Sequence, residues 1–145
     1  MNARTQLSPD RLAVRATPIS SSKVPVTLSE RIAELKALKN GWYNGTGLAP
    51  RHDDLDWLRS NFDENYPPDL PPPFLYPTVE GGIRIEWSLP PYEFSLEIEP
   101  DSRTGNWHSL NIRDDSERIE VLDLARREGW MWLAREVRAA AEVGR

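Results

Sequence analysis

The sequence predicts an α+β fold, in which an antiparallel meander sheet of 4-5 strands has two N-terminal helices and a C-terminal helix packed on one face. Three observations predict this class. Apolar residues recur at helical spacing between Leu28 and Phe62, the period changes to two between Phe74 and Ile112, and helical spacing returns after Asp123. Strands that follow one another through short connections tend to be neighbours, which favours the meander.

The composition predicts one globular domain that folds without covalent cross-links. The chain has 145 residues, of which 28% are charged and 39% hydrophobic, and it has no cysteine. Disulfides and thiolate metal sites are therefore excluded. No apolar run reaches the roughly 20 residues that cross a bilayer, so we expect a cytoplasmic protein.

Residues 1–26 differ in composition from the rest of the chain. They contain no aromatic residue, and they include Pro9, Pro18, Pro25 and a run of three serines. A segment with so little apolar periodicity cannot bury itself, which predicts a disordered or flexible leader before a single α+β domain at residues 27–145. The alternative is a segment that orders on a partner.

Two helices are predicted before the sheet. Thr27 and Glu30 have the spacing of a capping box, and Asn40-Gly41 is a typical helix end. The second helix is predicted to begin near Pro50 and to end at Tyr66-Pro67. The apolar positions at helical spacing are Leu28, Ile32, Leu35 and Leu38 in the first helix and Leu55, Leu58 and Phe62 in the second.

Alternation of apolar and polar residues predicts the strands. Pro77 cannot donate a hydrogen bond to a neighbouring strand, so the first strand is expected at an edge of the sheet. Residues 118–122 fit either a fifth strand or the start of the last helix, and the strand is favoured. The other strands are predicted at Phe74–Val79, Ile83–Trp87, Tyr92–Ile98 and Trp107–Ile112.

The last helix is predicted to run from a cap at Asp123 to about Glu142. Its apolar face is expected to contain Trp130, Leu133, Val137 and Ala141. Gly129 lies inside this helix, where glycine is less favourable than alanine by about 1 kcal/mol.

Charge is unevenly distributed along the chain, whose net charge is −5. Residues 53–101 contain twelve acidic and two basic residues, a net charge of −10, whereas residues 1–52 have a net charge of +5. A field of that sign repels the phosphates of nucleic acid and attracts basic surfaces. The middle of the chain therefore favours a basic protein partner.

A row of carboxylates is the first candidate site. Glu93, Glu97 and Glu99 alternate with the apolar residues of one predicted strand, and Glu86 on the neighbouring strand extends the row. This alternation predicts a solvent-facing sheet surface. Such a surface suits docking of a basic partner, and the alternative is that paired carboxylates catalyse hydrolysis.

The two histidines are the second candidate. His52 and Asp56 lie four residues apart and share a helix face, while His108 lies on a predicted strand. Imidazole with carboxylate can bind metal or transfer protons, but the sequence has no metal-binding motif. We therefore expect no catalytic residue, no metal and no cofactor.

Two further features concern glycine and tryptophan. The turn at residues 41–47 is glycine-rich before a helix but lacks the lysine of a phosphate-binding loop, so we expect a packed structural loop. Six tryptophans are many for this length, and we expect at least one to be exposed. Trp57 lies off the apolar stripe of its helix and is predicted to be a hydrophobic anchor for a partner.

Several short motifs resemble those of a group of small bacterial proteins of unassigned function. The likeness covers roughly residues 28–98, with an echo at residues 129–133, and it excludes the leader. It implies an accessory protein of a mobile element or defence system and carries no catalytic residues. The motifs are Gly41-Trp42 with Asn44-Gly45, Leu70-Pro71-Pro72-Pro73, Pro77-Thr78, Gly81-Gly82-Ile83 and Glu86-Trp87.

Together these features predict a non-enzymatic protein-interaction module with an acidic surface, similar to an antitoxin, immunity or inhibitor protein. The binding residues would be Glu93, Glu97, Glu99 and Trp57. One alternative is a small hydrolase in which both histidines converge on one pocket. A second is nucleic-acid binding through the basic leader, which carries Arg4, Arg11, Arg15 and Lys23.

Overall fold

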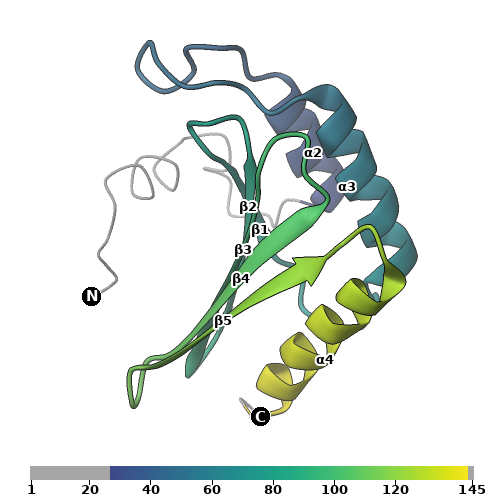
Figure 1. Ribbon diagram of the computed structural model, residues 1–145, viewed down its shortest axis with the longest axis vertical. Coiled ribbons are helices and arrows are strands. Elements are labelled where there is room, and N and C mark those ends of the chain that lie inside the picture. Colours follow the sequence, from purple (N-terminus) through teal and green to yellow (C-terminus); the bar gives the residue numbers. More distant parts are fainter. Residues whose placement is uncertain (1–26, 144–145) are drawn as a thin grey trace.

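The computed structural model of the chain describes residues 27–143, so the predicted leader lies outside the described residues. The described part is α+β, with three helices on one side of a five-stranded sheet (Figure 1). The elements in chain order are α2 (Leu28–Lys36), α3 (His52–Asn65), β1 (Phe74–Pro77), β2 (Ile83–Leu89), β3 (Tyr92–Ile98), β4 (Thr104–Asn111), β5 (Ser116–Asp123) and α4 (Arg127–Val143).

The sheet is the predicted antiparallel meander. Its strands lie in the order β1-β2-β3-β4-β5, so that each strand pairs with the next in the chain. The strand that contains Pro77 is at one edge, as expected, and residues 118–122 belong to the fifth strand rather than to the last helix. The face that packs against the helices carries Ile85, Leu96 and Trp107, which lie side by side on the three central strands.

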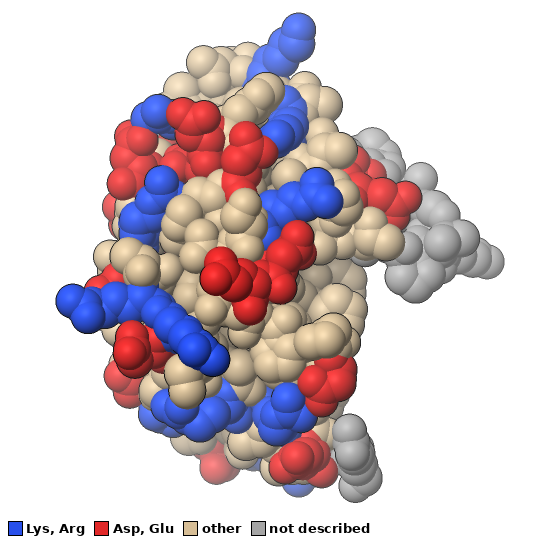
Figure 2. Space-filling model, turned by 90° about the vertical axis from the view of Figure 1, so that its right-hand side faces the viewer, with Lys and Arg blue, Asp and Glu red and all other residues tan. Residues whose placement is uncertain are grey.

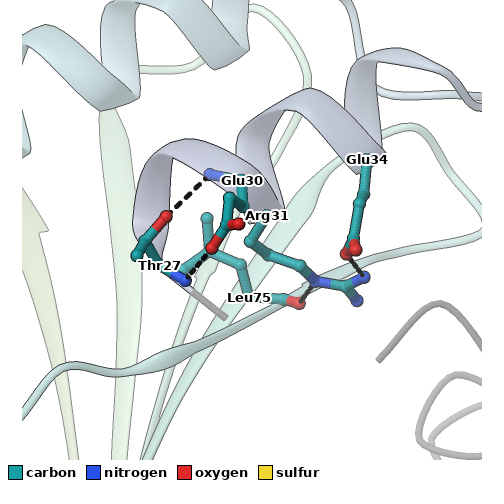
Figure 3. A network of polar contacts seen from close by, with 5 residues as sticks. All are labelled: Thr27, Glu30, Arg31, Glu34 and Leu75. Atoms are coloured by element: carbon teal, nitrogen blue, oxygen red, sulfur yellow. Dashed lines mark hydrogen bonds and ion pairs between the residues drawn. The ribbon is translucent and has the colours of Figure 1, made fainter. Parts of the chain in front are cut away.

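Helix α2 begins with the predicted capping box and is held against the sheet by one arginine (Figure 3). The Thr27 amide donates to Glu30 Oε1 at 3.0 Å, and the Glu30 amide donates to Thr27 Oγ1 at 3.1 Å. Hydrogen bonding from the backbone amide of Thr27, and then from its side chain, to the carboxylate holds the pKa of Glu30 below its usual range. Arg31 Nε donates to the carbonyl of Leu75 on β1 at 2.8 Å, and its Nη1 donates to Glu34, which fixes α2 beside the edge strand.

The predicted apolar faces of the other helices are confirmed with small shifts. Leu55, Leu58 and Phe62 of α3 are buried as expected. In α4 the fourth buried position is Ala140, three residues after Val137, rather than the predicted Ala141, four residues after it; both spacings are close to one helical turn. The first helix ends at Lys36, before the predicted stop at Asn40-Gly41, and the second begins at His52, two residues after Pro50.

Six aromatic side chains contact one another in series through the core, and we call this series the aromatic circuit. The Trp130 ring contacts Phe62 edge-on at 5.9 Å, Phe62 stacks on Tyr66 at 4.3 Å, and Tyr66 contacts Trp87 at 6.2 Å between ring centroids. Trp87 continues to Trp107 at 5.8 Å, and Trp107 meets the edge of Trp132 at 5.5 Å. Since Trp130 and Trp132 both belong to α4, the circuit starts and ends on the same helix.

The expectation of an exposed tryptophan is wrong. Three of the six are buried and three are half-buried. Trp132 points to a different side of α4 from Trp130, as its position two residues on requires, but its ring folds back onto Trp107. The half-buried tryptophans are Trp42, Trp57 and Trp132.

Tyr66 joins the aromatic circuit to the proline-rich connector. Its hydroxyl accepts a hydrogen bond from Trp87 Nε1 at 3.0 Å and donates to the carbonyl of Pro71. Burial raises the pKa of Tyr66 to about 12, although the bond from Trp87 acts in the opposite direction. The neutral phenol is therefore the form that the folded chain holds.

This raised pKa predicts a loss of stability in alkali. The stabilisation from a neutral Tyr66 is fully present below about pH 10, the ordinary value, and is lost as the pH rises towards about 12. We expect the difference in unfolding free energy between the wild type and Tyr66→Phe to shrink over this range in urea titrations. A difference that stays constant up to pH 12 would contradict the assignment.

Candidate interaction surface

One face of the sheet is not covered by any helix of residues 27–143. We call it the open face; it consists of the outward side chains of β1 to β5 (Figure 1). Strand pairing arranges these side chains in three rows. The rows are Phe74, Glu86, Ser95, His108 and Ile119; then Tyr76, Arg84, Glu97, Asn106 and Val121; then Ser88, Glu93, Leu110 and Glu117.

Acidic groups outnumber basic ones on the open face. Its strand residues from Phe74 to Val121 include four glutamates, at 86, 93, 97 and 117, and one arginine, Arg84. The side covered by helices differs, because acidic and basic side chains are interspersed there (Figure 2). Of the twelve acidic residues between 53 and 101, three are on these strands, at 86, 93 and 97, and five are on α3.

Glu93 and Glu97 occupy the centre of this face, on β3. Glu93 Oε2 accepts a hydrogen bond from Ser88 Oγ at 2.6 Å, and Glu97 lies 3.5 Å from Arg84 Nη2. The side chain of Glu97 is still 41% exposed. Glu99 follows the end of β3 with the same alternation and is exposed. The three predicted carboxylates therefore line one side of the sheet.

Glu86 departs from the predicted solvent-facing row. It is on β2 in the middle of the open face, yet only 5% of its surface is exposed. Its neighbours in the row are Phe74 on β1 and Ser95 on β3. Glu86 is thus a buried member of the open face, and alternation alone could not distinguish it from the exposed glutamates.

Trp57 lies away from the carboxylates. It is on α3, in the layer that covers the opposite side of the sheet, and its ring packs against the core. The guanidinium of Arg103 lies over the ring at 4.4 Å. A partner that contacts Glu93 and Glu97 through the open face would not reach this tryptophan, because the sheet separates them.

The two histidines also lie on different sides of the sheet. His52 starts α3, and its Nε2 lies 2.9 Å from the carbonyl oxygen of Lys36. His108 is on the open face of β4, and its Nε2 lies 2.7 Å from Glu117 Oε1. The pocket in which both histidines would converge, which the hydrolase alternative requires, is therefore not formed.

The glycine-rich turn satisfies its own hydrogen bonds. Gly41 and Gly47 have positive φ values of 91° and 90°, which glycine adopts at no steric cost. The amide of Gly41 donates to the carbonyl of Gly47 at 2.7 Å, and Tyr43 and Thr46 exchange bonds at 2.8 and 2.9 Å. These amides point into the loop, which agrees with a structural turn rather than a phosphate cradle.

The concave sites beside α4 do not bring together a group of side chains suited to catalysis. One has a volume of about 400 Å³ and lies between the proline-rich connector, the β2–β3 turn and the C-terminal half of α4. Two of its three charged residues, Arg138 and Asp69, pair with each other at 2.8 Å, and the third is Glu142. Among residues 27–143, no three side chains of the metal-binding types come together, and no helix has the length and apolarity needed to cross a membrane.

Sequence reasoning did not single out the apolar side chains of the open face. Phe74, Ile119 and Val121 are 62%, 72% and 67% exposed. The signal was present, since Ile119 and Val121 alternate with Arg118, Glu120 and Leu122 in the last strand. These apolar groups flank the acidic centre on both edge strands.

No family model, curated protein or solved structure matches this chain.

Proposed function

We propose that the chain is a non-enzymatic protein-interaction module that binds a basic protein partner through the open face. An antitoxin, immunity or inhibitor-like accessory protein of a bacterial mobile element or defence system would act in this way, in the cytoplasm. The observation that carries the proposal is the group of carboxylates around Glu93 and Glu97, on the sheet face that no helix of residues 27–143 covers.

Charge supports a basic partner. Several negatively charged carboxylates on one face attract a basic surface over a distance of one Debye length, roughly 8 Å at physiological salt. This attraction raises the rate of association and disfavours acidic partners. Glu93 and Glu97 point to the same side of β3 with Ser95 between them, and Glu99 continues the alternation, so one basic segment running along β3 could meet all three.

Apolar groups beside the acids support a protein rather than a small ion. Stable protein interfaces combine a desolvated apolar centre with a polar surround. Phe74 on β1 and Ile119 and Val121 on β5 supply apolar area at either side of the carboxylates. A partner that covers the sheet would bury these side chains and gain about 25 cal/mol for each Å² of apolar surface removed from water.

Affinity capture with matched variants tests the proposal. The open-face variant combines Glu93→Gln, Glu97→Gln and Glu99→Gln; the control combines Asp53→Asn, Asp63→Asn and Glu64→Gln on α3, which removes the same charge from the other side. We expect a basic protein of the native host to be retained by the wild type and the control at about 0.1 M salt. It should be lost from the open-face variant and released by about 0.5 M salt.

Two outcomes would contradict the proposal. One is a retained protein that the open-face variant binds as strongly as the control does. The other is the capture of acidic proteins only, since their charge would oppose binding to this face.

A further inference from the structure

Strand β5 is a long edge strand with exposed apolar side chains. Among the described strands it pairs with β4 alone, and at eight residues it exceeds the usual five or six. Its main chain on the outer side offers N–H and C=O groups that can pair with another strand. Ile119 and Val121 are 72% and 67% exposed, so this edge has apolar side chains to bury as well.

We propose that two copies of this chain pair through β5, antiparallel, with Ile119 of one copy opposite Ile119 of the other. The two-fold axis would run perpendicular to the sheet, so the two five-stranded sheets would join into one sheet of ten strands. Both sets of helices would then lie on the same side. The inference does not depend on the basic partner proposed above.

Charge selects this register. With Ile119 opposite Ile119, Arg118 of each copy lies opposite Glu120 of the other, on the helix side of the sheet, and two reciprocal ion pairs form. A shift of two residues in either direction would place Arg118 opposite Arg118 or Glu120 opposite Glu120, and like charges directly opposite are destabilising. A shift of one residue would place the helices of the two copies on opposite faces of the joined sheet.

The existing contacts of Arg118 are compatible with this arrangement. Its guanidinium lies 3.2 Å from Glu120 Oε2 and 3.2 Å from Glu136 Oε1 within the same chain. The Arg118 and Glu120 side chains are 50% and 42% exposed, which leaves both accessible to a second copy. Pairing would extend these contacts into a network of two arginines and four glutamates across the two-fold axis.

Helix α4 contacts the interior of the sheet as well as β5. Its Trp130 contacts Phe62 of α3, and its Trp132 contacts Trp107 of β4, so the helix lies over the interior of the sheet. Figure 1 shows α4 next to β5, on the same side of the sheet as α3. A second β5 can therefore approach in the plane of the sheet.

Disulfide trapping tests the contact, because the chain has no cysteine of its own. Directly opposite residues of an antiparallel pair have Cα atoms about 4.5–5.5 Å apart, inside the range that a disulfide bridges. We expect Ile119→Cys to form a covalent dimer under mild oxidation, at least about tenfold faster than Ile112→Cys. Ile112 is the matched control, since it is 53% exposed and lies in the loop after β4.

Charge reversal tests the register. By light scattering after size exclusion, the wild type should dimerise as its concentration rises. Arg118→Glu and Glu120→Arg should each weaken the dimer about tenfold, and the double variant should restore it. Circular dichroism confirms that each variant is folded. Equal trapping at positions 119 and 112, a monomeric wild type at all concentrations, or a double variant as weak as the single ones would overturn the proposal.

Discussion

Replacing Trp130 with alanine is expected to lower the free energy of unfolding by about 3–5 kcal/mol, the usual cost of truncating a buried tryptophan. Trp130 is 1% exposed, and its ring meets Phe62 edge-on across the α3–α4 contact. Its Nε1 donates to the carbonyl of Leu124 at 3.0 Å. The substitution would leave a cavity and an unpaired carbonyl together. Urea titration followed by circular dichroism measures the loss.

Trp132 provides the matched control for this prediction. It is in the same helix but half-buried, with Trp107 on one side and the guanidinium of Arg118 at 5.2 Å from the ring centroid. We expect Trp132→Ala to cost about 1–2 kcal/mol, because less of the ring leaves water on folding. An equal loss from the two substitutions would contradict the assignment of Trp130 to the core.

Replacing Gly129 with alanine is expected to destabilise the chain by about 2 kcal/mol, although alanine favours helix over glycine by about 1 kcal/mol. A Cβ at this position would lie 2.2 Å from the carbonyl oxygen of Asp123 and 2.9 Å from its carbonyl carbon. Both are backbone atoms at the end of β5, so the first turn of α4 would have to move away from the strand.

The helix itself supplies the control for Gly129. Ala139 is exposed in α4, and Ala139→Gly should lower stability by about 1 kcal/mol, which measures the intrinsic cost of glycine in this helix. If Gly129→Ala instead raised the unfolding free energy, the close approach to Asp123 would not limit the packing of α4.

The sequence was sufficient to predict the elements and the faces that they bury. Periodicity located Leu55, Leu58 and Phe62 in the core, and it placed Glu93 and Glu97 on the opposite side of the sheet from the buried Leu96. These assignments depend only on side chains a few residues apart, whose directions follow from helix and strand geometry.

What depends on distant residues could not be predicted. From the sequence, Gly129 is only an unfavourable residue inside a helix; the structure shows that the carbonyl of Asp123 leaves no room for a Cβ there. Alternation does not reveal that Glu86 is buried while its equivalents on β3 are partly exposed. The separation of Trp57 from the carboxylates likewise depends on which face of the sheet α3 covers.

The series of ring contacts in the aromatic circuit joins α4, α3 and the sheet to one another. Helix α4 is attached to it twice, through Phe62 of α3 and through Trp107 of β4. Lifting this helix would therefore expose aromatic surface on both of its neighbours at once, so partial detachment would gain little freedom for a large loss of contact. The tryptophan emission of this chain should accordingly report a single concerted transition on unfolding, coincident with the loss of helical circular dichroism.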